Sequence, residues 1–210
     1  MVIIGDLIDR GPNTKLLIDE IMRLQEEGFN IVCTIGNHEE LMFRGAGSVR
    51  AEDNWRLNNG GIETLDSFGV ECYNDLDEKY KSFFMHLLLK AEIDKYIFIH
   101  AGINNIHFKD PFLPSVVLWI KNWYDLLDKD WLGDRYIIHG HVPQYYEDII
   151  NQFEHFETNR YLNIDAGCCY TSTYPLHRKN EPERLVKLQK LCLVDLTNRK
   201  LYFEENCEFT

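Results

Sequence analysis

Four apolar runs of the sequence each end in side chains that can bind a metal ion or transfer a proton. The four ends are Gly5-Asp6-Leu7-Ile8-Asp9-Arg10-Gly11, Gly36-Asn37-His38-Glu39, His100-Ala101-Gly102 and His139-Gly140-His141. In parallel α/β sheets the reacting groups lie just beyond the carboxyl ends of the strands. We therefore expect one edge of a sheet to bring these four segments together.

The residue types in these segments suit a transition metal. Carboxylate, amide oxygen and imidazole together favour manganese, iron or zinc over calcium, and no thiolate accompanies them. A single histidine after a strand is usually an ordinary core or surface residue. Polar clusters at four strand ends favour a shared metal site instead, because only folding can bring such distant residues together.

The four segments resemble successive signature motifs of the phosphoprotein phosphatase branch of the calcineurin-like metallophosphoesterases. Within that branch they are most similar to bacterial serine/threonine phosphatases and symmetrical diadenosine tetraphosphatases. The likeness covers nearly the whole chain and includes Trp119 and the segment 162–167. It implies an α/β (α+β) fold in which two mixed β-sheets pack as a sandwich flanked by helices, as a single domain over residues 1–210.

The resemblance also implies a set of metal ligands. Members of the family bind two divalent metal ions, and Asp6 would bridge them. Asn37, His100 and His141 would complete the second of the two sites, which is therefore fully represented in the chain. Manganese is the metal expected first, with iron or zinc as alternatives.

The remaining site residues follow from the same motifs. His38 would donate a proton to the leaving oxygen, because an imidazole has its pKa near the operating pH, and Asp9 would hold its ring by a hydrogen bond. Arg10 would bind phosphate oxygens, with Asn37 as a further substrate contact. Lys121 stands where a second phosphate-binding arginine is expected, keeping the charge but not the bidentate fork. A local salt bridge in the loop is the alternative for Asp9 and Arg10.

One departure from the family pattern bears on activity. Family members open with a strand ending in Gly-Asp-x-His-Gly, followed by a helix, whereas Met1 stands only five residues before Asp6. Since a β-α-β unit needs about 30 residues, we expect the chain to be truncated at its N-terminus and to lack that Asp and His. A wrongly assigned start codon and a true loss would give the same sequence.

Composition limits the classes of partner. The net charge of −12 and the pI near 5.1 argue against nucleic acid and anionic membranes. Six cysteines without Cys-x-x-Cys spacing favour reduced thiols, and no apolar run approaches 18 residues. We expect a cytoplasmic protein whose partners are a phosphorylated protein or a small phosphoester.

Periodicity predicts the elements that position the motifs. Helices are expected from Asn13 or Thr14 to Gly28, over 39–43, through the apolar stripe at 80–88, and from 118. The polar region 45–61, with Trp55, is either a helical cap beside the site or a surface loop. Strands are expected at 29–35, 96–99, 136–139, 161–165, 191–195 and 201–203, the last two joined by a hairpin turn at Asn198-Arg199.

Three functions agree with these patterns. The leading hypothesis is a metal-dependent phosphomonoesterase of the serine/threonine phosphoprotein phosphatase type, which the second Asp of Gly-Asp-x-x-Asp-Arg-Gly, Asp9, favours. The alternative within the enzyme class is a dinucleoside polyphosphate hydrolase. The third is a degenerate, non-catalytic member that binds a metal or a phosphate, and its support is the missing first motif.

Overall fold

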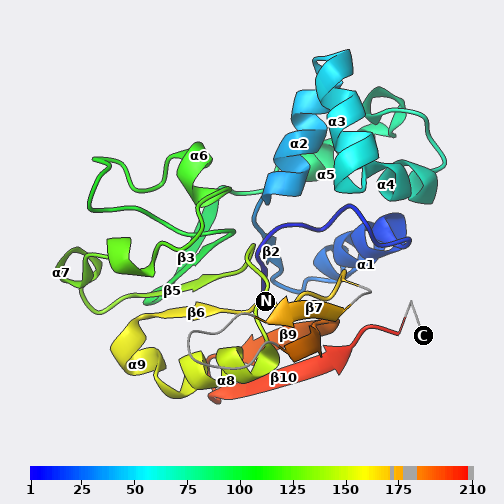
Figure 1. Cartoon of the computed structure of the whole chain (residues 1–210). Coiled ribbons are helices and arrows are strands. Elements are labelled where there is room, and N and C mark those ends of the chain that lie inside the picture. The colour runs from blue at the N-terminus through cyan, green and yellow to red at the C-terminus, as the bar shows by residue number, and fades with distance from the viewer. Residues whose placement is uncertain (171–172, 177–183, 208–210) are drawn as a thin grey trace.

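A computed structural model describes residues 1–170, 173–176 and 184–207 (Figure 1). Its helices are α1 (Thr14–Glu26), α2 (Asn37–Ala46), α3 (Val49–Asn59), α4 (Gly61–Phe68), α5 (Glu78–Met85), α6 (Pro114–Val117), α7 (Lys129–Leu132), α8 (Tyr146–Glu154) and α9 (Phe156–Asn159), with 3-10 turns η1 (Tyr73–Asp75) and η2 (Tyr124–Leu126). Its strands are β1 (Val2–Ile3), β2 (Val32–Cys33), β3 (Lys90–Ile93), β4 (Tyr96–Ile99), β5 (Tyr136–His139), β6 (Tyr161–Asn163), β7 (Thr173–Leu176), β8 (Arg184–Lys187), β9 (Lys190–Asp195) and β10 (Lys200–Glu205).

The strands that carry the motifs run parallel in pairs. β1 pairs with β2, and β4 pairs with β5, which in turn pairs with β6. β3 joins β4 antiparallel, so the order of this sheet is β3-β4-β5-β6. Figure 1 shows α2 to α5 gathered at one end of the molecule and β7, β9 and β10 at the other. The parallel pairing places the ends of β4 and β5, with their histidines, at one edge.

The predicted α/β class is confirmed, with shorter strands than the sequence indicates. Within the described residues the strands form one four-stranded sheet and three two-stranded ones. The strand expected at 29–35 contributes only Val32–Cys33 to its ladder, although Thr34 forms a further parallel bridge with Leu88. β9 and β10 form the expected hairpin, and their register places Asp195 opposite Lys200. No helix in the described ranges is long and apolar enough to cross a membrane.

Two helical segments differ from the sequence patterns in instructive ways. The region 45–61 is helical, as the cap interpretation required, and contains α3. The helix expected to begin at 118 is wrong: α6 ends at Val117, and the chain turns with Asn122 at a φ of 52°. Trp123 is the reason, because its indole packs against Gly102 and donates to the Ala101 carbonyl oxygen at 3.0 Å. Tertiary packing here overrides helical propensity.

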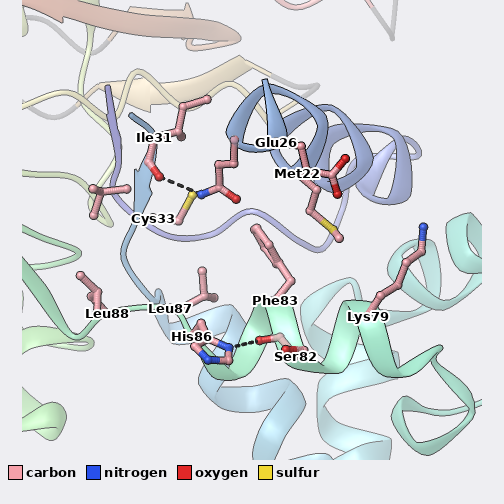
Figure 2. Close-up of a pocket in the computed structure, with 12 residues that line it drawn as sticks. Met22, Glu26, Ile31, Cys33, Lys79, Ser82, Phe83, His86, Leu87 and Leu88 are labelled. Atoms are coloured by element: carbon pink, nitrogen blue, oxygen red, sulfur yellow. Dashed lines mark hydrogen bonds between the residues drawn. The ribbon is translucent and has the colours of Figure 1, made fainter. Parts of the chain in front are cut away.

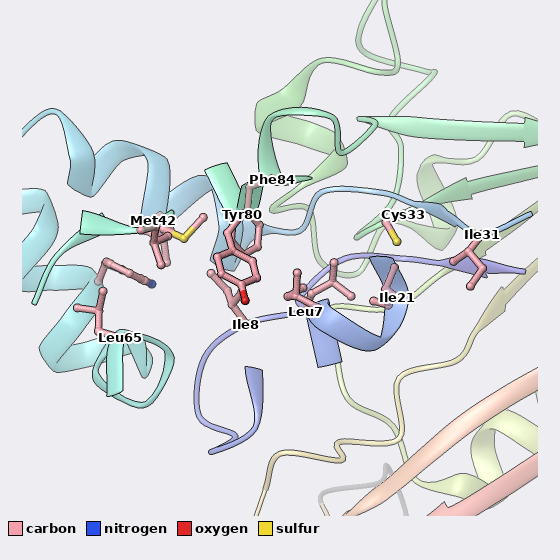
Figure 3. Close-up of a cluster of buried hydrophobic side chains, with 13 residues drawn as sticks. Leu7, Ile8, Ile21, Ile31, Cys33, Met42, Leu65, Tyr80 and Phe84 are labelled. Carbon is pink, nitrogen blue, oxygen red and sulfur yellow. The ribbon is translucent and has the colours of Figure 1, made fainter. Parts of the chain in front are cut away.

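The loop after β1 is anchored in the core by its apolar residues. Leu7 and Ile8 are buried among side chains of α1, α2, α4 and α5 (Figure 3). Burying a side chain of this size stabilises the fold by about 1.5–3 kcal/mol. The loop is therefore fixed by Leu7 and Ile8 while the polar residues on either side of them remain available. Among the cysteines, Cys33 and Cys192 are buried, whereas Cys207 is exposed.

Candidate active site

The four predicted metal ligands lie together. Ligand atoms of Asp6, His100 and His141 are all within 4.8 Å of one another. The Asn37 Oδ1 lies 2.9 Å from His100 Nε2 and 2.9 Å from His141 Nδ1. Asp6 follows β1, Asn37 opens α2, and the two histidines follow β4 and β5. Four segments that are far apart in the sequence thus supply one cluster.

The arrangement of lone pairs in this cluster suits a cation. The Nδ1 of His100 lies 2.9 Å from the Ile4 carbonyl oxygen, to which it can only donate. In that tautomer Nε2 carries a lone pair and faces the Asn37 Oδ1 at 2.9 Å and the Asp6 Oδ1 at 3.4 Å, both of which are acceptors. Acceptors facing one another repel unless a proton or a metal ion lies between them. The residues present therefore fit a divalent metal ion.

The charges around the cluster keep the ligands in the forms that bind metal. Although burial opposes it, the charges of His100 and His38 lower the pKa of Asp6. Burial and the charge of His100 lower the pKa of His141 to about 4, so its ring is neutral at neutral pH. Metal ligands must be ionised carboxylates and neutral imidazoles. The electrostatics agree with the geometry.

The backbone is strained where the site residues stand. Asp6, Asp9, Arg10 and His141 have φ values of 53°, 75°, 65° and 72°, in the left-handed region that L residues rarely adopt. Each such residue costs about 1–3 kcal/mol, and such strain gathers at functional sites. In this chain it turns side chains of two loops toward one cluster.

Gly5 and Gly36 allow the first two motifs to touch. A Cβ on Gly36 would lie 2.2 Å from the Asp6 Oδ1, and one on Gly5 would lie 2.5 Å from the Gly36 nitrogen. Any side chain at either position would push the loops apart. The close approach lets the backbone N–H of His38, in the first turn of α2, donate to the Asp6 Oδ1 at 3.2 Å.

Glu39 ties the same two loops together, a role that the sequence motif did not reveal. Its carboxylate accepts N–H groups from Gly36 at 2.7 Å, Leu7 at 2.6 Å and Asp6 at 3.1 Å. It is fully buried, and burial together with the charge of Asp6 raises the pKa of Glu39 to about 7. The three N–H donors oppose that rise by favouring the anion.

His38 and Asp9 form a buried pair at the side of the cluster. His38 Nδ1 lies 2.6 Å from the Asp9 Oδ2, and both side chains are almost fully buried. Asp9 also accepts the Trp55 indole N–H at 3.0 Å and the Thr64 hydroxyl at 2.8 Å. Burial alone would lower the pKa of His38, but the hydrogen bond to Asp9 and the charge of Asp6 raise it. Asp9 thus contacts the His38 ring, which is the arrangement that the resemblance implies, and within the described residues it forms no salt bridge with Arg10.

We expect Thr64→Val to destabilise the fold while preserving side-chain shape. The hydroxyl donates to Asp9 and also accepts the Asp9 backbone N–H at 2.8 Å, so both groups would be left buried without this partner. The expected loss is about 1–3 kcal/mol in the free energy of unfolding, measured by urea denaturation. Thr158→Val, at an exposed position, is the control and should change it by less than about 0.5 kcal/mol. Equal effects of the two substitutions would contradict this role of Thr64.

The predicted phosphate-binding residues are more exposed. Arg10 stands beside the pair of His38 and Asp9, and its Nη1 donates to the Cys169 Sγ at 3.4 Å. Lys121 is exposed, and its charge is one of those that lower the pKa of His141. Trp119 packs edge-on to His141 with ring centroids 6.3 Å apart. These residues surround the cluster but do not enter it.

Two other polar residues of the motifs have structural positions. His139 is buried, contacts Trp123 and lies 3.2 Å from the Tyr124 hydroxyl, and burial lowers its pKa to about 3. Asp165 accepts the Gly167 N–H at 2.9 Å and so fixes the turn after β6. A cavity of about 590 Å³ lies elsewhere, between α1, β2 and α5 (Figure 2). Its lining within the described chain includes none of the predicted site residues.

Comparison with known proteins relates this chain to phosphoesterases. The chain is 27% identical over 201 residues to bis(5'-nucleosyl)-tetraphosphatase PrpE [asymmetrical] of Oceanobacillus iheyensis, covering 87% of this chain and 75% of that protein. It is 23% identical over 199 residues to the protein of the same name from Geobacillus sp., covering 87% of this chain and 76% of that protein. The family model described as calcineurin-like phosphoesterase matches residues 1–180. The chain therefore belongs to the calcineurin-like phosphoesterase family and is a hydrolase.

Proposed function

We propose that this protein is a metal-dependent hydrolase that cleaves dinucleoside tetraphosphates. The observation that carries the proposal is the convergence of Asp6, Asn37, His100 and His141 beside the buried pair of His38 and Asp9. A cluster of metal ligands next to a carboxylate-supported histidine is what phosphoryl transfer to water needs.

The relatives guide the choice of substrate. Both are named as asymmetrical tetraphosphatases, which supports dinucleoside polyphosphates more directly than the phosphoprotein substrates that the motifs favoured. The pair of Asp9 and His38 serves either substrate, because both reactions break a bond between phosphorus and oxygen. The choice between them therefore rests on the relatives and not on this pair.

The proposed metal site consists of Asp6, Asn37, His100 and His141, and manganese is the metal expected first, ahead of iron or zinc. A divalent ion bound there supplies positive charge to the phosphate oxygens and lowers the pKa of water. The Asp9 carboxylate accepts the Nδ1–H of His38 and favours the imidazolium, whose Nε2–H can then be given to the leaving oxygen. The Arg10 guanidinium presents parallel N–H groups to a phosphate.

Product analysis tests this proposal. With added manganese, we expect the purified chain to hydrolyse diadenosine tetraphosphate to ATP and AMP, as separated by ion-exchange chromatography. Two molecules of ADP would indicate symmetrical cleavage instead. A phosphoserine peptide serves as the competing substrate. If the peptide is hydrolysed and the tetraphosphate is not, the phosphoprotein phosphatase hypothesis is correct. If the chain binds the metal but hydrolyses neither substrate, the non-catalytic hypothesis is correct.

A further inference from the structure

The guanidinium of Arg10 is held by neutral groups. Its Nη1 donates to the Cys169 Sγ at 3.4 Å, and its central carbon lies 5.7 Å from the centre of the Tyr170 ring. Within the described ranges no carboxylate forms a salt bridge with it. A carboxylate partner would neutralise the positive charge of an arginine beside an anion site. A thiol and an aromatic ring are uncharged, so they leave the positive charge available to an anion.

The thiol of Cys169 stays protonated in this position. Burial raises its pKa, although the neighbouring Arg10 favours the thiolate. A neutral sulfur is a weak acceptor. It can therefore orient the guanidinium without competing strongly with a phosphate oxygen for the same N–H groups.

The segment that carries Cys169 is fixed from outside the site. Asp165 accepts the Gly167 N–H at 2.9 Å, and the Cys168 carbonyl oxygen accepts the Asn206 side-chain N–H at 2.8 Å. Gly167 has a φ of 68°, which reverses the chain after β6. On the other side, the backbone N–H of Arg10 donates to the Gly60 carbonyl oxygen at 3.2 Å. The two partners are thus presented to each other from rigidly held backbone.

We propose that Cys169 is a positioning residue that orients the Arg10 guanidinium for a phosphate group of the substrate while leaving its charge unpaired. The inference rests on the proposed function, in which Arg10 contacts phosphate. It predicts that the chemistry of residue 169 sets the affinity for phosphate rather than the rate of turnover.

Three variants test the proposal: Cys169→Ala removes the acceptor, Cys169→Ser keeps a neutral acceptor, and Cys169→Asp supplies a charged one. The readouts are kcat and KM for p-nitrophenyl phosphate with manganese, and the Kd of inorganic phosphate by calorimetry. We expect Cys169→Ala to raise KM and Kd about 3- to 10-fold with kcat within about twofold, as for loss of one weak hydrogen bond. Cys169→Ser should remain within about twofold of the parent. Cys169→Asp should raise both constants by more than about 10-fold, because it pairs with the guanidinium.

The control is Cys72→Ala, which removes a thiol that donates to the Asp75 carboxylate at 3.2 Å, outside the site, and should change none of these values. Thermal melting confirms that each variant is folded. Unchanged KM and Kd in Cys169→Ala and Cys169→Asp would overturn the proposal, as would a loss confined to kcat or a failure of the parent chain to bind phosphate. If the parent turns over no substrate but its phosphate Kd follows the variant series, the proposed function fails and the positioning role stands.

Discussion

His141→Ala is expected to release the metal ion and to lower phosphoesterase activity by at least about 10²-fold. His141 supplies one of the two imidazoles of the cluster, and its Nδ1 lies 2.9 Å from the Asn37 Oδ1. Its Nε2 is buried without a hydrogen-bond partner among the described residues. Changes in groups that merely support metal ligands already cost 10- to 100-fold, so removal of a ligand should cost more. Metal content after dialysis and initial rates with p-nitrophenyl phosphate measure both effects.

The matched control for this substitution is His155→Ala. His155 is exposed at the end of α8, its Nδ1 lies 2.8 Å from the Asn151 carbonyl oxygen, and it belongs to none of the four motifs. The His155→Ala variant should bind as much manganese as the parent chain and hydrolyse substrate at the same rate. If His141→Ala keeps its metal and its activity, the cluster is not the metal site and the proposed mechanism is wrong.

The sequence predicted the parts of the site that lie in the loops just after strands. Asp6, Asn37, His100 and His141 each lie within three residues of the end of an apolar run, and parallel pairing of β4 with β5 brings two of them to one edge. Short-range pattern and a general rule of α/β sheets were enough for this step. The helix of α1 was similarly predictable, because its apolar spacing and its end near Gly28 are local features.

The parts that the sequence could not predict depend on contacts between distant residues. Thr64 meets Asp9 across 55 positions, and Cys169 meets Arg10 across 159. Neither residue belongs to a motif or to a periodic pattern, so nothing local marks it. The helix wrongly predicted from Leu118 has the same origin, because the packing of Trp123 on Gly102 depends on the whole fold. Glu39 is different, because it lies inside the second motif and the sequence could have suggested a role for it.

The left-handed residues of the site explain why its geometry needs such distant support. Asp6, Asp9 and Arg10 lie within five positions and all have positive φ. A strained conformation persists only when its surroundings determine it. Glu39 holds the N–H groups of Asp6 and Leu7, and Gly60 accepts that of Arg10. Hydrogen bonds from α2 and from the end of α3 therefore stabilise this loop in the strained conformation that faces the cluster.

His38→Asn should lower turnover by roughly 10² to 10⁴, as expected for loss of a general acid, while leaving metal content unchanged. Asparagine can keep a hydrogen bond to Asp9 but cannot deliver a proton at neutral pH. The loss should depend on the leaving group: it should be largest with a phosphoserine peptide, whose alkoxide is strongly basic, and smallest with p-nitrophenyl phosphate. Steady-state kcat values with these two substrates measure the difference.

A second substitution separates proton transfer from a structural effect. Asp9→Asn removes the charge that holds His38 Nδ1 at 2.6 Å, and it should lower turnover in the same order of substrates but by a smaller factor. In the double variant His38→Asn/Asp9→Asn we expect no loss beyond that of His38→Asn alone, because Asp9 acts only through the imidazole and such pairs are not additive. Loss of the metal in His38→Asn, an equal slowing of both substrates, or additive losses in the double variant would each show that His38 is not the proton donor.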